Sequence, residues 1–119
     1  ADATITGPST TGYSVAMNGD ISGDGNADIV VNAYDQGSTS RGTSYFFEGP
    51  LTGTLAHGSS DGTWTGTDNY DYSGYAKSLT YAGDTDGDGY DDVLVGAAYA
   101  EDGKNRQGIS YLLLGGPNY

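Results

Sequence analysis

The stretch Asp84-Thr85-Asp86-Gly87-Asp88-Gly89-Tyr90-Asp91-Asp92 places aspartates at positions 1, 3, 5 and 9 of a short loop. Gly89, at position 6, permits the tight turn that brings alternate side chains toward one point. The backbone carbonyl of Tyr90, at position 7, can turn toward the same centre. Hard oxygen donors gathered in this way suit Ca²⁺. The predicted calcium ligands of this loop are Asp84, Asp86, Asp88, Tyr90 and Asp92.

A related loop occurs 64 positions earlier, as Asp20-Ile21-Ser22-Gly23-Asp24-Gly25-Asn26-Ala27-Asp28. Its predicted ligands are Asp20, Ser22, Asp24, Asn26 (through its carbonyl) and Asp28. Ser22 puts a neutral hydroxyl where the second loop has a carboxylate, so we expect the second loop to bind calcium more tightly. The alternative for both loops is an acidic turn that binds only water.

Neither loop continues as an EF-hand. Position 12 of an EF-hand carries a glutamate that binds calcium with both oxygens, whereas this chain has Val95 and Val31 there. The flanking sequences also lack a helical pattern. An EF-hand is therefore excluded, and each loop is expected to join two β-strands.

The loops belong to a longer internal repeat. The apolar run 92–95 follows the second loop as 28–31 follows the first, again 64 positions apart. The stretch 61–66 matches 2–7 with an offset of 59, and Ser110-Tyr111 matches Ser44-Tyr45 with an offset of 66. Changing offsets indicate small loop insertions. The chain is therefore divided into residues 1–59 and 60–119.

Each unit contains four short β-like runs separated by turns. The expected strands are residues 3–6, 13–17, 28–33 and 44–48, followed by 63–65, 76–81, 92–97 and 109–114. Four-stranded sheets that repeat at this spacing are typical of β-propellers. The sequence therefore predicts an all-β fold of two four-stranded antiparallel blades. Because two blades are too few to close a ring, we expect a partial propeller or one completed by oligomerisation.

With these motifs in place, the chain resembles the FG-GAP repeats of integrin α-subunit propellers and their bacterial relatives. The resemblance rests on residues 12–20 and 92–97, although Thr11-Gly12 and Tyr75-Ala76 stand where Phe-Gly is usual. It implies about one structural Ca²⁺ per repeat, two per chain. It also implies a secreted or cell-surface module that acts in adhesion or protein interaction.

Composition narrows the possible partners. A formal net charge of −12 disfavours binding to nucleic acid or to anionic membranes. No apolar run approaches the roughly 20 residues of a membrane span, so no membrane insertion is expected. Catalysis is not expected either, because the turn-like sequence around the single histidine, His57, shows no pattern that indicates a catalytic nucleophile and an orienting acid.

Two further possibilities concern ligands and assembly. The tyrosine-rich tract 68–75 either packs between blades or serves sugar or peptide recognition, and the second interpretation makes a lectin-like propeller the alternative function. Residues 2–6 resemble the outer strand of a blade, and the last unit lacks such a strand. Residues 2–6 are therefore predicted to pair with residues 108–114 of a neighbouring copy, in a trimer or a tetramer. A fragment of a longer propeller is the alternative.

Overall fold

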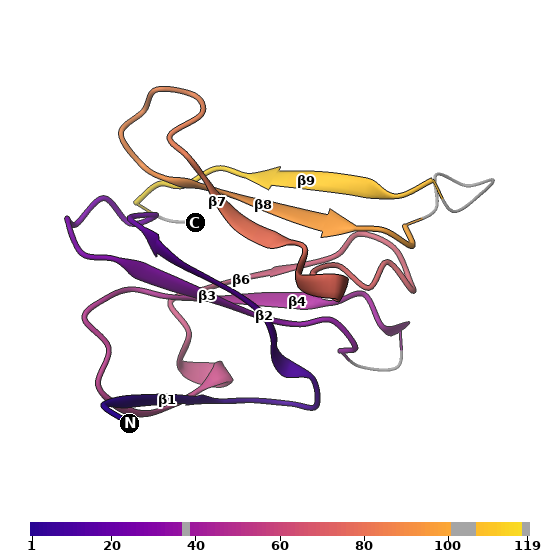
Figure 1. Cartoon of the computed structure of the whole chain (residues 1–119), viewed down its shortest axis with the longest axis horizontal. Helices are drawn as coiled ribbons and strands as arrows, with labels where there is room; N and C mark the ends of the chain where they lie inside the picture. Colours follow the sequence, from indigo (N-terminus) through magenta and orange to yellow (C-terminus); the bar gives the residue numbers. More distant parts are fainter. Residues whose placement is uncertain (37–38, 101–106, 118–119) are drawn as a thin grey trace.

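The computed structural model describes residues 1–36, 39–100 and 107–117 (Figure 1). Its strands confirm the all-β prediction, and short 3₁₀ helices such as η2 and η3 interrupt them in these described residues. The elements in order are β1 (Ala3–Thr6), β2 (Thr11–Gly19), β3 (Asp28–Ala33), β4 (Thr43–Phe47), β5 (Gly53–Ala56), η2 (His57–Ser59), β6 (Gly62–Thr65), η3 (Tyr75–Lys77), β7 (Leu79–Gly83), β8 (Asp92–Ala97) and β9 (Ile109–Leu113). No helix in the described ranges has the length and apolar character needed to cross a bilayer.

The first sheet has four antiparallel strands in the order β2-β3-β4-β6. Its fourth strand comes from the second sequence unit, since Thr65 of β6 lies opposite Thr43 of β4. The second sheet, in the order β7-β8-β9, has three strands in the described part of the chain rather than the four expected. The difference has a topological reason, because residues 63–65, expected as a strand of the second unit, belong to β6 and pair with β4 of the first sheet.

A third, two-stranded sheet pairs β1 with β5 in parallel. The sequence did not predict β5, because its four residues, Gly-Thr-Leu-Ala, show little strand pattern. Residues 76 and 77 were expected to begin a strand and instead belong to η3, where Ala76 has a φ of 59°. That left-handed turn delays the start of β7 to Leu79.

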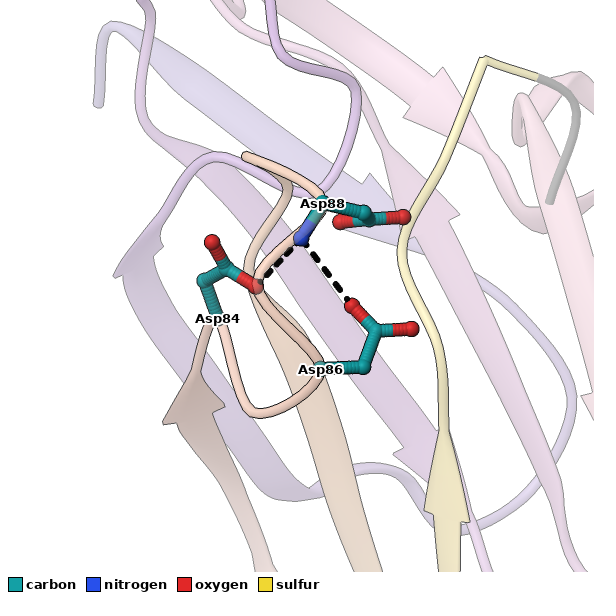
Figure 2. Close-up of side chains that lie close together, drawn as sticks. All are labelled: Asp84, Asp86 and Asp88. Atoms are coloured by element: carbon teal, nitrogen blue, oxygen red, sulfur yellow. Dashed lines mark hydrogen bonds between the residues drawn. The ribbon is translucent and has the colours of Figure 1, made fainter.

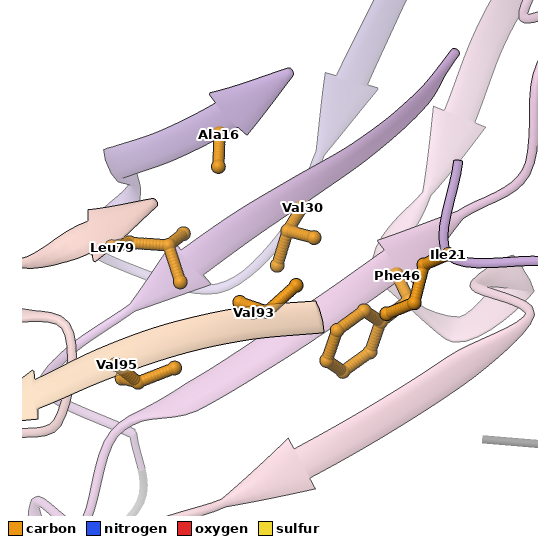
Figure 3. Close-up of a cluster of buried hydrophobic side chains, with 7 residues drawn as sticks. All are labelled: Ala16, Ile21, Val30, Phe46, Leu79, Val93 and Val95. Atoms are coloured by element: carbon orange, nitrogen blue, oxygen red, sulfur yellow. The ribbon is translucent and has the colours of Figure 1, made fainter. Parts of the chain in front are cut away.

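The main core lies between the first and second sheets (Figure 3). Strand alternation sends Ala16, Val30 and Phe46 from β2, β3 and β4 to this side, where they contact residues of β7 and β8. Burial of a valine, leucine or phenylalanine side chain contributes about 1.5–3 kcal/mol to the stability of the fold. The buried cluster consists of Ala16, Ile21, Val30, Phe46, Leu79, Val93 and Val95.

The opposite side of the first sheet is only half covered. Ala33, Tyr45 and Phe47 form a second buried cluster, with Ile5, Leu51 and Leu55 packed against it. The β1–β5 pair therefore lies on the side of the first sheet away from the second sheet, as Figure 1 shows.

Candidate metal centre

The two acidic loops lie at the same end of the stacked sheets, where they join β2 to β3 and β7 to β8 (Figure 1). The glycine at position 6 of each loop adopts a positive φ, 85° for Gly25 and 95° for Gly89. Side chains rarely tolerate such angles. The tight turn predicted from the glycine positions is therefore present in both loops.

The second loop brings three predicted ligands together. Carboxylate oxygens of Asp84, Asp86 and Asp88 lie within 4.8 Å of one another, and all three residues are exposed (Figure 2). Asp84 also shapes the turn, because its Oδ1 accepts the N–H groups of Gly87 and Asp88, at 2.6 and 3.1 Å, and its Oδ2 accepts that of Gly89, at 2.9 Å. The loop backbone thus orients a carboxylate group toward its neighbours.

The pKa of Asp86 reflects desolvation of its carboxyl group and the negative charges around it. Desolvation raises the pKa of this carboxyl above its ordinary value of 3.8, and repulsion from Asp88, Asp92 and Asp84 adds to the effect. A divalent cation would compensate this repulsion. Three carboxylates in an exposed, tightly turned loop are a donor set that fits Ca²⁺ better than the nitrogen- and sulfur-seeking metals.

Asp92, the predicted ligand at position 9, lies behind the loop rather than in the three-carboxylate cluster. It is fully buried, and its Oδ2 accepts hydrogen bonds from the backbone N–H and the hydroxyl of Thr85. Its Oδ1 accepts the N–H of Gly115, at 2.9 Å. Burial would raise the pKa of Asp92, but the hydrogen bonds from Thr85 and Gly115 outweigh it and lower the pKa. Asp92 Oδ1, which accepts a single hydrogen bond, retains a lone pair for a further partner, whereas Oδ2 already accepts two.

Asp28 makes the same arrangement in the first loop. Its Oδ2 accepts the N–H groups of Ile21 and Ser22, at 2.9 and 3.0 Å, and its Oδ1 accepts that of Gly49, at 2.9 Å. Asp28 and Asp92 thus tie the start of each loop to the segment after the third strand of the same sheet. We call these two residues the clamp aspartates.

The first loop holds its polar groups differently from the second. Asp20 accepts the N–H groups of Asp24 and Gly25, at 3.0 and 2.9 Å, while the Ser22 hydroxyl lies 3.5 Å from Asp20 Oδ1. Asp24 accepts both the backbone N–H and the side-chain amide of Asn26, whose side chain lowers the pKa of Asp24. In the described ranges, a three-carboxylate cluster of this kind occurs in the second loop alone.

Two residues of the second loop hold the loops together. The Asp91 N–H donates to the Asp20 carbonyl at 2.9 Å, and the Asp20 N–H donates to Asp91 Oδ2 at 2.9 Å. The ring of Tyr90 lies against Gly23, and its N–H donates to Asp88 Oδ1 at 3.0 Å. Asp91 therefore links the loops, a role that sequence reasoning missed. The sequence feature that pointed to this role is the difference at position 8, which is Asp91 in the second loop and Ala27 in the first.

The opposite end of the sheets carries a cluster of tyrosines. Tyr34, Tyr72, Tyr75 and Tyr99 line a pocket of about 270 Å³. The rings of Tyr72 and Tyr75 each contact Tyr99 edge-on, with centroids 5.8 and 5.6 Å apart. The predicted tract 68–75 supplies two of these rings. His57 is exposed and its ring contacts Tyr45 edge-on, at 5.3 Å between centroids.

Comparison with known proteins supports the blade architecture. Residues 80–113, which include the second loop, β8 and β9, match the FG-GAP repeat family. The chain is 33% identical over 111 residues to integrin alpha-PS2 of Drosophila melanogaster. That alignment covers 89% of this chain and 8% of the relative, so the chain spans a small part of the protein it matches. FG-GAP repeats form propeller blades, and the two stacked sheets are therefore blades of a partial propeller.

Proposed function

We propose that this chain is a calcium-stabilised, non-catalytic propeller module that acts in protein interaction and adhesion outside the cell. The observation that carries the proposal is the convergence of Asp84, Asp86 and Asp88 carboxylates in a loop that the FG-GAP match includes. The similarity to an integrin alpha chain supports a role in protein interaction and a cell-surface or secreted location.

In this proposal calcium has a structural role. Bound Ca²⁺ would neutralise the repelling carboxylates of the second loop, with Asp84, Asp86 and Asp88 as side-chain ligands and the Tyr90 carbonyl and Asp92 completing the set. Asp92 holds the loop against Gly115, and Asp91 holds it against the first loop. The first loop would bind a second ion through Asp20, Ser22, Asp24, Asn26 and Asp28. Ion binding would thus rigidify one end of both blades.

A reciprocal exchange between the loops tests the metal assignment. Asp86→Ser gives the second loop the residue of the first, and Ser22→Asp does the reverse. Isothermal titration with Ca²⁺ should show weaker binding for Asp86→Ser and tighter binding for Ser22→Asp. Terbium luminescence sensitised by Tyr90, whose ring lies against Gly23 of the first loop, reports ion binding to the pair of loops. Calcium at about 10 mM, well above the millimolar affinities of extracellular modules, should raise the melting temperature, and an unchanged value would refute the proposal.

Adhesion requires its own assay. Surfaces coated with the protein should retain cells in calcium, and chelation should release them if the loops support the binding surface. A coat of the Asp84→Asn, Asp88→Asn double variant provides the matched control. Equal attachment with coated and bare surfaces would refute the adhesive role and leave the metal assignment to the titrations.

A second candidate, carbohydrate binding, is favoured by the tyrosine pocket. Its rings offer flat apolar faces and hydroxyl groups, and no charged side chain of the described residues lines the pocket. Glycan-array binding by the protein should be lost in Tyr75→Ala, whose ring lines the pocket. Tyr70→Ala, which alters an exposed ring outside the lining, should bind normally. A blank array would exclude the lectin-like function.

A further inference from the structure

Each sheet has a second face with apolar side chains that the described part of the chain leaves partly or wholly uncovered. On the first sheet the exposed face carries Val15 and Met17, which are 56% and 60% exposed, and these residues line a groove with Ile29 and Val31. We call it the first-sheet face. On the second sheet Leu94, Leu112 and Leu114 are 39%, 47% and 51% exposed. We call these three residues the second-sheet face. Uncovered apolar surfaces of this kind mark interaction sites.

The internal repeat shows how these faces pack. An offset of 64 relates Val15, Met17, Ile29 and Val31 to Leu79, Tyr81, Val93 and Val95, which cover the first sheet inside this chain. Offsets of 64 and 66 relate Leu94 and Leu112 to Val30 and Phe46, which form the other half of that core. The two uncovered faces are therefore the two halves of an interface that the chain already contains once.

Strand β1 extends this correspondence to the sheet edges. Ile5 is the repeat equivalent of Trp64, at the offset of 59. Trp64 packs on the second sheet, with its ring centroid 4.9 Å from that of Tyr111. Ile5 packs against the cluster that contains Tyr45, the repeat equivalent of Tyr111. Thus β1 already lies where the fourth strand of a preceding blade would lie.

Both strand edges needed for this pairing are available. In the described part of the chain β1 pairs with β5 alone, which leaves one of its edges without a strand. Strand β9 is at the end of the three-stranded sheet, at the position where β6 joins β4 in the first sheet. Strand edges of this kind pair readily with another chain.

We propose that a second copy of this chain occupies both sites, with β1 of one copy pairing antiparallel to β9 of the next. Translating the β4–β6 register through the repeat places Thr6 opposite Ile109, Ile5 opposite Ser110, Thr4 opposite Tyr111 and Ala3 opposite Leu112. The second-sheet face of the copy that supplies β9 then covers the first-sheet face of the copy that supplies β1.

The contact joins two different surfaces, so it propagates from copy to copy until a ring closes. Two blades per chain make six blades from a trimer and eight from a tetramer. The proposal depends on the fold and the repeat, and it stands independently of the metal assignment and of any ligand.

Disulfide trapping tests the register, because the chain has no cysteine of its own. The Cα atoms of directly opposed residues in antiparallel strands lie about 4.5–5.5 Å apart, within the range of Cα–Cα distances that a disulfide bridges. Mixing Ile5→Cys protein with Ser110→Cys protein under oxidation should give a disulfide-linked dimer. The double variant should give a ladder of linked multimers. Thr80→Cys, on the far strand of the same sheet, replaces Ser110→Cys in the control mixture and should give little dimer.

Native mass spectrometry and light scattering of the unaltered protein provide a readout that needs no variant. The expected mass is that of a trimer or a tetramer, and Leu112→Asp should reduce it to a monomer because a charge enters the apolar contact. A monomeric mass for the unaltered protein at all concentrations would overturn the proposal. Equal crosslinking by the Ser110→Cys and Thr80→Cys mixtures would overturn the register.

Discussion

Replacing Asp92 with asparagine tests whether the clamp aspartates stabilise the fold apart from any metal. The Asp92 carboxylate accepts two hydrogen bonds from Thr85 and one from Gly115 while fully buried. Asparagine retains one acceptor oxygen and presents an amide donor in place of the other. The donors that faced the second oxygen then lose their partner.

The expected loss follows from these contacts. A hydrogen bond to a charged group contributes roughly 1.5–3 kcal/mol, and an unpaired buried donor incurs a further penalty. Because one or two such bonds are lost, we expect Asp92→Asn to lower the free energy of unfolding by about 3 kcal/mol. At roughly 4 °C per kcal/mol for a domain of this size, the melting temperature should fall by about 12 °C.

Urea denaturation in EDTA isolates this effect, since chelation removes any contribution of bound calcium. Asp28→Asn is the matched variant, because Asp28 makes the equivalent bonds to Ile21, Ser22 and Gly49. Asp2→Asn, at an exposed position, should change the free energy of unfolding by less than about 0.5 kcal/mol. If Asp92→Asn unfolds in EDTA within 0.5 kcal/mol of the unaltered protein, the reasoning on the clamp is refuted.

Three further predictions use other features of the structure. Val30→Ala should lower the free energy of unfolding, measured in urea, by about 2 kcal/mol, because Val30 is fully buried. Leu94→Ala, at the equivalent position of the second repeat, should lower it by less in the isolated chain. Equal losses would contradict the assignment of the core. Gly19→Ala should lower the free energy of unfolding by about 1–3 kcal/mol, because a Cβ there would lie 2.1 Å from the Tyr81 ring. An unchanged melting temperature in calorimetry would contradict this prediction. Because the pKa of Asp92 is lowered in the folded state, its carboxylate stabilises the fold above the ordinary pKa of 3.8, and this contribution is lost as pH falls through the lower folded-state pKa. Between pH 5 and pH 2 the melting temperature of Asp92→Asn should therefore fall less than that of the unaltered protein.

Much of the fold was readable from local pattern. The apolar runs at 28–33 and 92–97 are β3 and β8 at the predicted bounds, because an apolar run between turn signals forms a buried strand. Glycine at position 6 of each loop predicted the positive φ angles that Gly25 and Gly89 adopt. Residues 53–56 were missed as a strand, since their pairing with β1 is a long-range contact that leaves little local pattern.

The sequence by itself determined the repeat, the strands and the set of oxygen donors, because spacing along the chain controls turns and alternation. Tertiary structure alone decided how the donors divide. The carboxylates of Asp84, Asp86 and Asp88 lie together at the surface. Asp92 instead points inward, because the backbone N–H groups of Thr85 and Gly115 need a hydrogen-bond acceptor where the loop meets the sheet. Tertiary structure also decided which sheet faces are covered. The repeat makes both sheets alike in sequence, but packing between them buries one face of each, whereas the other faces keep Val15 and Met17 of the first sheet and Leu94 and Leu112 of the second exposed.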